Sequence, residues 1–138
     1  MTKVVFPVGA VTAMNKENNM LDKVLRITQL LDFYSALLTE KQRQVLEMHY
    51  QDDWSLAEIS DSFGVSRQAV HDILRRAEQV LEEYEIKLAL VDRHERQKET
   101  LRQVHGLLSQ LPASVQELTP FHQALGKLGQ LLEDSPEV

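Results

Sequence analysis

Apolar residues recur every three or four positions along most of the chain, which is the spacing of amphipathic helices. The first well-patterned segment runs from Met20 to Leu38. A second helix is expected from Glu40 to about Tyr50. Thr39 precedes this helix and Gln42 lies in its first turn. The two residues have the Thr-x-x-Gln spacing of a capping box, in which each side chain satisfies a free backbone amide. The pattern therefore predicts two successive helices in the N-terminal half.

A second pair of helices is predicted after the polar segment 51–54. Ser55 and Glu58 have capping-box spacing and open a short helix, and Gly64 ends it because glycine adopts the left-handed conformation common just past a helix end. Ser66 is then expected to cap a long helix that runs from Arg67 toward Asp92.

The remainder of the chain is also helical in pattern. One apolar stripe ends at Pro112, Ser114 and Glu117 are expected to cap a short turn, and Thr119-Pro120 places proline at the start of a last helix. The predicted fold class is all-α, a helix-turn-helix domain with a long recognition helix and a C-terminal helical segment. The expected divisions are a disordered leader at 1–19, the helix-turn-helix domain at 20–93 and the helical segment at 94–138.

The composition and the spacing of residues exclude several classes of function. The chain has no cysteine and a formal net charge of −6, so thiolate chemistry, Cys-type zinc sites and nucleic-acid binding by bulk positive charge are excluded. No apolar run approaches the roughly 20 residues that a membrane span needs. The five histidines include no pair at the spacing of a metal-binding helix, and no phosphate-binding glycine loop is present. We expect a cytoplasmic protein that is not an enzyme and needs no cofactor or metal.

The most informative segment is Ser55–Arg76, where two helices meet at a glycine turn. A small residue, Ser60, lies four positions before Gly64, so the two helices can approach closely, as in a helix-turn-helix. The second helix of this motif places its N-terminal residues in the DNA major groove. The expected turn and core residues are Ile59, Ser60, Phe63, Gly64, Val65, Val70 and Ile73.

The outward residues of the second helix are candidates for DNA contact. Arg67 can bridge two acceptors of guanine, and Gln68 can pair with adenine. Ser66 suits a phosphate at the helix start, and Arg75 and Arg76 suit the backbone further along. The expected DNA-binding set is Ser66, Arg67, Gln68, His71, Arg75 and Arg76.

The charge near this helix is weak for a DNA-binding surface. Residues 64–77 contain three arginines and one aspartate, and acidic residues lie on both sides of the segment. A single copy would neutralise about three phosphates, which gives a salt dependence of about −2.7 in log–log slope. DNA binding therefore predicts a homodimer that presents two such helices.

The run FYSALLTEKQRQVLEMHYQDDWSLAEISDSFGVSRQAVHDILRRAEQVLEEYEIKL resembles the YlxM family of small bacterial helix-turn-helix proteins. The resemblance covers about residues 20–93, and the same run is similar to the promoter-reading region 4 of sigma factors. No counterpart of the promoter-melting sigma region is present. The family is associated with the signal recognition particle, so the resemblance implies an all-helical, dimeric, non-enzymatic protein with a regulatory or assembly role in that pathway.

The sequence therefore predicts a DNA-binding helix-turn-helix regulator associated with the signal recognition particle. The alternative is an adaptor that does not bind DNA and docks a protein or RNA component of the particle through its acidic faces. DNA is favoured over RNA as the nucleic acid because the A-form major groove is too narrow for a helix.

Overall fold

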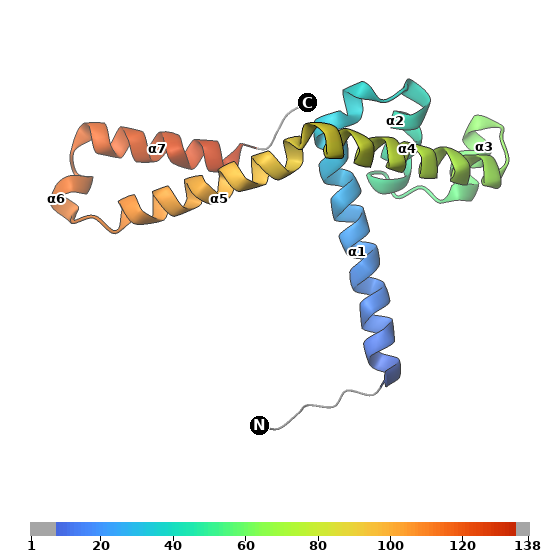
Figure 1. Cartoon of the computed structure of the whole chain (residues 1–138), viewed down its shortest axis with the longest axis horizontal. Helices are drawn as coiled ribbons and strands as arrows, with labels where there is room; N and C mark the ends of the chain where they lie inside the picture. The colour runs from blue at the N-terminus through green and yellow to red at the C-terminus, as the bar shows by residue number, and fades with distance from the viewer. Residues whose placement is uncertain (1–7, 135–138) are drawn as a thin grey trace. The chain divides into compact units, whose positions relative to one another are not determined.

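We describe the fold from a computed structural model that covers the backbone of residues 8–134 and the side chains of residues 19–134 (Figure 1). Every regular element in this range is a helix, which confirms the all-α class. The elements are α1 (Val8–Tyr34), a 3-10 turn η1 (Ser35–Leu37), α2 (Glu40–Tyr50), α3 (Leu56–Phe63), α4 (Arg67–Leu88), α5 (Leu90–Ser109), α6 (Ala113–Gln116) and α7 (Thr119–Glu133). None of the helices in the described residues is both long and apolar enough to cross a bilayer.

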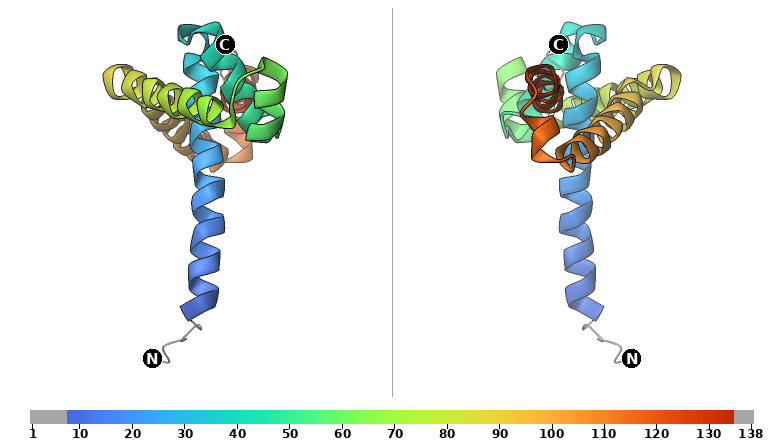
Figure 2. Two further views of the ribbon diagram at one scale, coloured as in Figure 1. Left: turned by 90° about the vertical axis from the view of Figure 1, so that its right-hand side faces the viewer. Right: turned by 90° about the vertical axis from the view of Figure 1, so that its left-hand side faces the viewer.

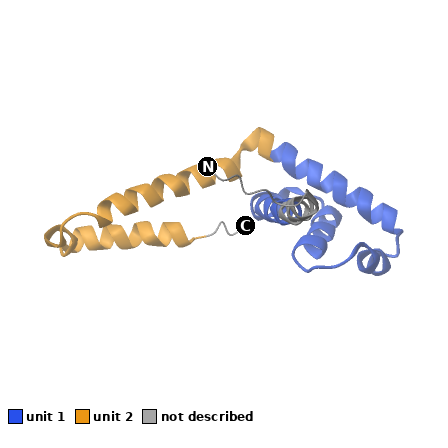
Figure 3. Ribbon diagram, turned by 90° about the horizontal axis from the view of Figure 1, so that it is seen from below, with its two compact units in different colours: residues 1–84 blue, residues 85–138 orange. Residues whose placement is uncertain are grey.

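The chain divides into two compact units, coloured separately in Figure 3. Unit 1 is residues 1–84 and unit 2 is residues 85–138. The boundary predicted from the sequence lies after Arg93, nine residues later than the end of unit 1. The division falls within α4, so the last turn of that helix is counted with unit 2.

The core of unit 1 is built from one apolar stripe on each helix. Buried positions in α1 and the turn after it recur at helical spacing, and the same is true of α4. Burying each Leu, Ile or Val side chain contributes about 1.5–3 kcal/mol. The buried apolar residues of unit 1 are Ile27, Leu30, Leu31, Tyr34, Leu38, Val45, Leu46, Ile59, Val70, Leu74, Ala77 and Leu81.

Helix starts agree with the predicted caps at three of four places. Thr39 forms the full capping box, in which its hydroxyl accepts from the Gln42 amide and its own amide donates to the Gln42 side chain. The Ser55 hydroxyl accepts from the Glu58 amide. Ser66 caps α4 in the same way. The fourth prediction is wrong, because α6 begins after Pro112 and has no side-chain cap.

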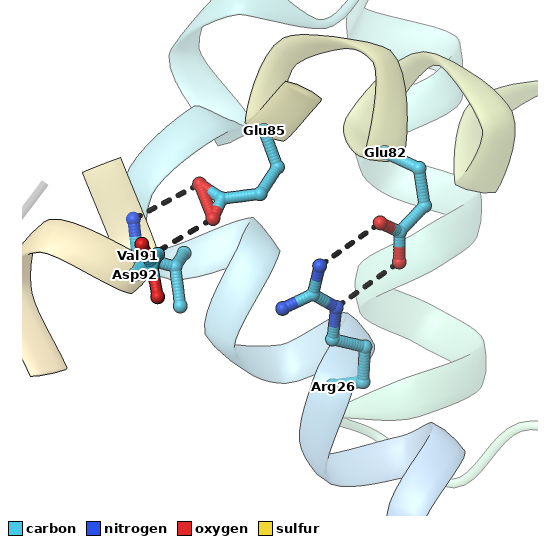
Figure 4. Close-up of polar contacts among 5 residues, drawn as sticks. All are labelled: Arg26, Glu82, Glu85, Val91 and Asp92. Carbon is cyan, nitrogen blue, oxygen red and sulfur yellow. Dashed lines mark hydrogen bonds and ion pairs between the residues drawn. The ribbon is translucent and has the colours of Figure 1, made fainter. Parts of the chain in front are cut away.

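Polar contacts join α1 to α4 across the core of unit 1. The Arg26 guanidinium donates two hydrogen bonds to the Glu82 carboxylate, through Nε at 3.1 Å and a terminal nitrogen at 3.0 Å (Figure 4). One turn earlier, the Lys23 ammonium lies 3.3 Å from a carboxylate oxygen of Glu78. The Tyr50 hydroxyl donates to the other oxygen of Glu78, so α2 joins the same network.

The loop between α2 and α3 is tied back to the end of α2. The Trp54 amide donates to the Met48 carbonyl at 2.9 Å, and the Trp54 carbonyl lies 3.0 Å from Nδ1 of His49. Asp53 has a positive φ of 63°, which aspartate tolerates better than most residues. Trp54 is half-buried in this closed loop.

The N-terminal leader differs from the expectation of disorder. Residues 8–19 continue α1 as one helix of 27 residues, and Figure 2 shows this helix from two further sides. The three-and-four spacing continues upstream of Met20 through Ala10, Val11, Ala13 and Met14, and this spacing is the signal in the sequence that indicates a longer helix. Residues 1–7, also assigned to the leader, lie outside the described residues.

The predicted single helix from Arg67 toward Asp92 is broken at Ala89, which has left-handed angles of φ 52° and ψ 35°. Helix α4 ends at Leu88 and α5 begins at Leu90. The buried Glu85 carboxylate accepts from the amides of Val91 at 3.0 Å and Asp92 at 3.3 Å (Figure 4). These bonds satisfy two amides that the start of a new helix leaves free, which compensates for the break.

Helices α5 and α7 of unit 2 form an antiparallel hairpin closed by α6 (Figure 1). The Gln116 side-chain amide donates to the carbonyls of Ser109 at 2.9 Å and Leu111 at 2.7 Å and so fixes the connection. Half-buried side chains recur every three or four residues on both helices and form the seam between them. They are His94, Lys98, Leu101, His105 and Leu108 on α5, and Phe121, Leu125, Leu128 and Leu132 on α7.

Candidate nucleic-acid interface

The turn between α3 and α4 has the geometry expected of a helix-turn-helix. Gly64 ends α3 with a left-handed φ of 65°, and its amide donates to the Ser60 carbonyl. The Val65 amide donates to the same carbonyl at 3.1 Å. A residue with a Cβ is strained at this φ even though the space around Gly64 is open. Glycine is therefore required by backbone conformation and not by packing.

The residues predicted to form the turn and its core differ in how far they are buried. Ile59 and Val70 are fully buried, and Ser60 is 5% exposed with its hydroxyl donating to the Ala57 carbonyl at 2.8 Å. A larger side chain at position 60 would have to displace its buried surroundings. Phe63, Val65 and Ile73 are half-buried, and Gly64 is exposed. Two buried apolar side chains, Ile59 and Val70, and the small, hydrogen-bonded Ser60 therefore hold α3 and α4 together at the turn.

The start of α4 is capped by Ser66. Its hydroxyl accepts from the Ala69 amide at 3.0 Å, and its carbonyl accepts from the Val70 amide at 3.1 Å. The hydroxyl keeps its own proton free to donate, so the cap and a phosphate contact are compatible.

All six residues predicted to contact DNA are exposed. Residues four apart share one side of a helix, so Arg67, His71 and Arg75 lie in one row and Gln68 and Arg76 in the adjacent row. The structure therefore brings the predicted set together on one outward side of α4. Among the described side chains, Arg67, Arg75 and Arg76 form no ion pair or side-chain hydrogen bond.

Two members of this set have a neighbour within the helix. The Gln68 side-chain amide donates to the Asp72 carboxylate at 3.1 Å, and Nδ1 of His71 lies 4.0 Å from the same oxygen. The Gln68 side chain, which is the one predicted to pair with adenine, is therefore already hydrogen-bonded to Asp72. The spacing of four residues between Gln68 and Asp72 was a signal in the sequence that could have predicted this contact.

The acidic residues that follow the arginines are partly neutralised. Glu78 pairs with Lys23, and Glu82 pairs with Arg26, both from α1. In the sequence these carboxylates weigh against DNA binding, because nothing in local spacing connects them to residues more than fifty positions earlier. The arginines therefore have less acidic competition than the sequence alone indicated.

Across the described residues, no three side chains of His, Asp or Glu gather where they could hold a metal ion.

Two helices that meet at a left-handed glycine turn, the second with exposed polar and basic side chains at its start, place this all-helical chain in the class of helix-turn-helix proteins. Comparison with known families agrees: residues 21–119 match the model of the UPF0122 family, described as "Putative helix-turn-helix protein, YlxM / p13 like". The chain belongs to this family, which confirms the resemblance seen in the sequence. The matched range ends at Thr119, where α7 begins.

Curated relatives share much of the chain. UPF0122 protein BH2485 of Halalkalibacterium halodurans is 47% identical over 109 residues, which cover 79% of this chain and 99% of the relative. UPF0122 protein GK1195 of Geobacillus kaustophilus is 42% identical over the same shares. UPF0122 protein ABC2295 of Shouchella clausii is 53% identical over 90 residues, 65% of this chain and 83% of the relative.

Proposed function

We propose that this protein is a cytoplasmic regulator that binds double-stranded DNA, with the N-terminal half of α4 in the major groove. The observation that carries the proposal is the exposed side of α4, where Arg67, Arg75 and Arg76 have no partner among the described side chains. Unpaired arginines can form new bonds to DNA without breaking existing ones. Arg67 would read guanine, and Arg75 and Arg76 would hold phosphates.

Duplex DNA is the favoured nucleic acid for geometric reasons. The major groove of B-DNA is about 12 Å wide and admits a helix, whereas the major groove of A-form RNA is deep and narrow. The capped start of α4 adds free backbone amides beside Ser66, which favour a phosphate.

DNA binding of useful strength requires two copies of the chain. The two phosphate-binding arginines of one copy correspond to a salt slope of about −1.8, and two copies double it. A homodimer is therefore part of this proposal.

We further propose that the regulated process is the signal recognition particle pathway. The support for this step is the resemblance of the chain to the YlxM family, and no residue of the helix-turn-helix identifies the target. The proposal of DNA binding does not depend on it.

The decisive experiment compares variants of α4 in genome-wide capture of bound DNA and RNA, with affinities measured at two salt concentrations. Arg67→Ala with Gln68→Ala is expected to reduce affinity for the enriched sites about 10- to 100-fold and to relax base preference. Arg75→Ala is expected to weaken binding to all sequences and to reduce the salt slope by about one.

Arg102→Ala provides the matched control, because it removes one exposed arginine from α5 and leaves α4 unchanged. Its affinity is expected to stay within about twofold of the wild type. Absence of any enriched DNA, or binding that is insensitive to Arg67 and Gln68, would contradict the proposal.

The second candidate is an adaptor that docks a basic partner in the same pathway. It is favoured by the acidic surface before α4, where Asp52, Asp53, Glu58 and Asp61 are all exposed. The partner would be a basic protein or an RNA-binding subunit of the particle. Capture of the partner by the Arg67→Ala, Gln68→Ala variant, together with loss of capture when Asp52 and Asp53 are changed to Asn, would favour the adaptor.

A further inference from the structure

Nothing in the sequence of residues 85–92 requires a helix to end there. The run Glu-Ile-Lys-Leu-Ala-Leu-Val-Asp has no glycine, proline or asparagine, and alanine has the highest helix propensity of all residues. Ala89 nevertheless has left-handed angles, φ 52° and ψ 35°, which are unfavourable for a residue with a Cβ. The break between α4 and α5 is therefore stabilised by contacts around Ala89 and not by local propensity.

The break is confined to one residue. The Ala89 amide donates to the Glu85 carbonyl at 2.8 Å, and the Arg93 amide donates to the Ala89 carbonyl at 3.0 Å, both as in an uninterrupted helix. The helical bond pattern therefore runs up to Ala89 and resumes at Arg93. Rotation of Ala89 to right-handed angles would join the two helices into one, from residue 67 to residue 109 and about 65 Å long.

Glu85 supplies the acceptors that the break removes. In a continuous helix, each amide donates to the carbonyl four residues earlier. In the structure, the amides of Val91 and Asp92 donate instead to the Glu85 carboxylate, at 3.0 Å and 3.3 Å (Figure 4). Each of these amides therefore has an acceptor in either arrangement, so straightening exchanges hydrogen bonds and leaves neither amide unpaired.

Packing holds the break at few points. Val91 is 2% exposed and Glu85 is 7% exposed, so these two side chains anchor the bent arrangement. No buried side chain lies between them: Ile86 is 82% exposed and Leu88 is 43% exposed. Straightening therefore withdraws mainly one apolar side chain, that of Val91, from its buried position.

We propose that Ala89 is a switch between two states of this segment. In the bent state Ala89 is left-handed and Glu85 caps α5, and in the straight state α4 and α5 are one helix. The bent state is the major one, because Glu85 and Val91 stabilise it. The unfavourable angles of Ala89 keep the free-energy gap small, so that the straight state holds about 1–10% of molecules. Interconversion changes the direction in which α5 leaves α4.

The proposal does not depend on DNA binding, because the switch lies outside the six candidate DNA-binding residues. It also differs from a purely structural cap. A cap alone predicts that loss of the Glu85 carboxylate frays the start of α5, whereas the switch predicts that this loss extends helix across Ala89. Molecules that stay bent without a cap expose the amides of Val91 and Asp92, so faster hydrogen exchange is expected in both cases. A distance measurement separates the two.

The test measures the distance between two spin labels on either side of Ala89 in the full chain. Because the chain has no cysteine, Gln79→Cys with Gln103→Cys places one label on α4, one on α5 and none elsewhere. Both glutamines are exposed. In a continuous helix, at about 1.5 Å per residue, these positions are about 36 Å apart, and the bent state gives a separate, shorter distance. Double electron–electron resonance reports the proportion of the two states.

Two substitutions are expected to shift this proportion in opposite directions. Glu85→Ala removes the acceptor from the bent state and should raise the ratio of straight to bent molecules about 10- to 100-fold. Ala89→Gly relieves the left-handed angles and weakens the straight helix, so it should lower the ratio about 10- to 100-fold. The double variant should return to within about 10-fold of the wild type.

Ala124→Gly is the matched control, because Ala124 is an exposed residue within α7 and its replacement weakens a helix without touching the switch. It should leave the label distances unchanged. Circular dichroism checks that each variant retains its helices, and if Glu85→Ala unfolds, Glu85→Gln replaces it, with an expected rise in the ratio of at least about 3-fold. Three results would each overturn the proposal: a folded Glu85 variant with no population near 36 Å, a double variant that keeps the straight population of Glu85→Ala, or an Ala124→Gly variant whose distances shift as those of Ala89→Gly do.

Discussion

The guanidinium of Arg26 and the carboxylate of Glu82 form a two-bond ion pair that links α1 to α4. The two residues are 56 positions apart in the chain. The pair therefore fixes the face of α1 that packs toward the helix bearing the candidate DNA-binding residues. Both side chains are 43% exposed, so solvent weakens the attraction.

A double-mutant cycle measures the strength of this pair. We expect Arg26→Ala and Glu82→Ala to show a coupling energy of about 0.5–1 kcal/mol in chemical unfolding, because a two-bond geometry places the pair near the upper end for exposed ion pairs. The Arg43–Glu47 pair within α2 is the control, with about 0.3–0.5 kcal/mol. Equal coupling in the two cycles would show that the two-bond geometry adds nothing.

Gly64 can be compared with Gly126, a glycine in the middle of α7. Neither position has an atom within 4 Å of an added Cβ, so packing does not differ between them. Gly64→Ala is expected to cost about 1–2 kcal/mol because of the left-handed backbone, whereas Gly126→Ala is expected to gain about 0.5–1 kcal/mol of helix stability. Thermal unfolding of both variants checks the opposite signs, and two effects of the same sign would contradict the prediction.

Glu85 is expected to hold the start of α5. Glu85→Ala removes a buried acceptor from the amides of Val91 and Asp92 and should cost about 1–3 kcal/mol. Hydrogen exchange should become faster first at these two amides. The exposed neighbour Glu83 is the control, and Glu83→Ala should change stability by less than about 0.5 kcal/mol.

Asp72 is expected to oppose DNA binding in two ways, because it repels phosphates and occupies Gln68. Asp72→Ala should therefore tighten binding to DNA by about 3- to 10-fold, which corresponds to about 0.7–1.4 kcal/mol. Gel-shift titration at constant salt measures the change. Unchanged or weaker binding would mean that Gln68 and Asp72 do not act at the interface.

The raised pKa of Tyr50 predicts that the folded chain loses stability in alkaline solution. Burial, the hydrogen bond to Glu78 and the charge of Glu78 all raise the pKa of the Tyr50 phenol above its ordinary value. The folded chain therefore holds this proton more strongly than the unfolded chain. Its contribution to stability is complete below about pH 10 and declines as the pH rises further.

The test compares the wild type with Tyr50→Phe between about pH 9 and pH 11.5. The wild type is expected to be more stable at pH 9 by about 1 kcal/mol, owing to the hydrogen bond, and the difference should shrink as the pH rises. A difference that stays constant with pH would contradict the assignment to this phenol.

The elements that the sequence predicted well are those set by local chemistry. The capping box at Thr39, the cap at Ser66 and the left-handed Gly64 each depend on residues within four positions, so their spacing alone is informative. The exposure of the six α4 residues followed from the same helical periodicity.

The features that the sequence did not predict depend on distant or unusual interactions. Ala89 rarely adopts left-handed angles, and the break there is stabilised by a buried carboxylate four residues earlier. The neutralisation of Glu78 and Glu82 depends on α1 packing, which no local pattern reveals. The helical continuation of residues 8–19 was obscured by Pro7, just before it, and by Gly9, its second residue, because both interrupt the apolar run at the start of the chain.

The aromatic residues of the chain are unevenly divided between the two units. The single tryptophan, Trp54, and all three tyrosines lie in residues 1–84, while unit 2 has only the ring of Phe121. Tryptophan fluorescence therefore reports on unit 1 alone, and the tryptophan and tyrosine bands of near-ultraviolet dichroism do the same, whereas far-ultraviolet dichroism reports on the helices of both units. In the intact, unlabelled protein, the difference between these signals during denaturation shows directly whether the two units melt together or one after the other.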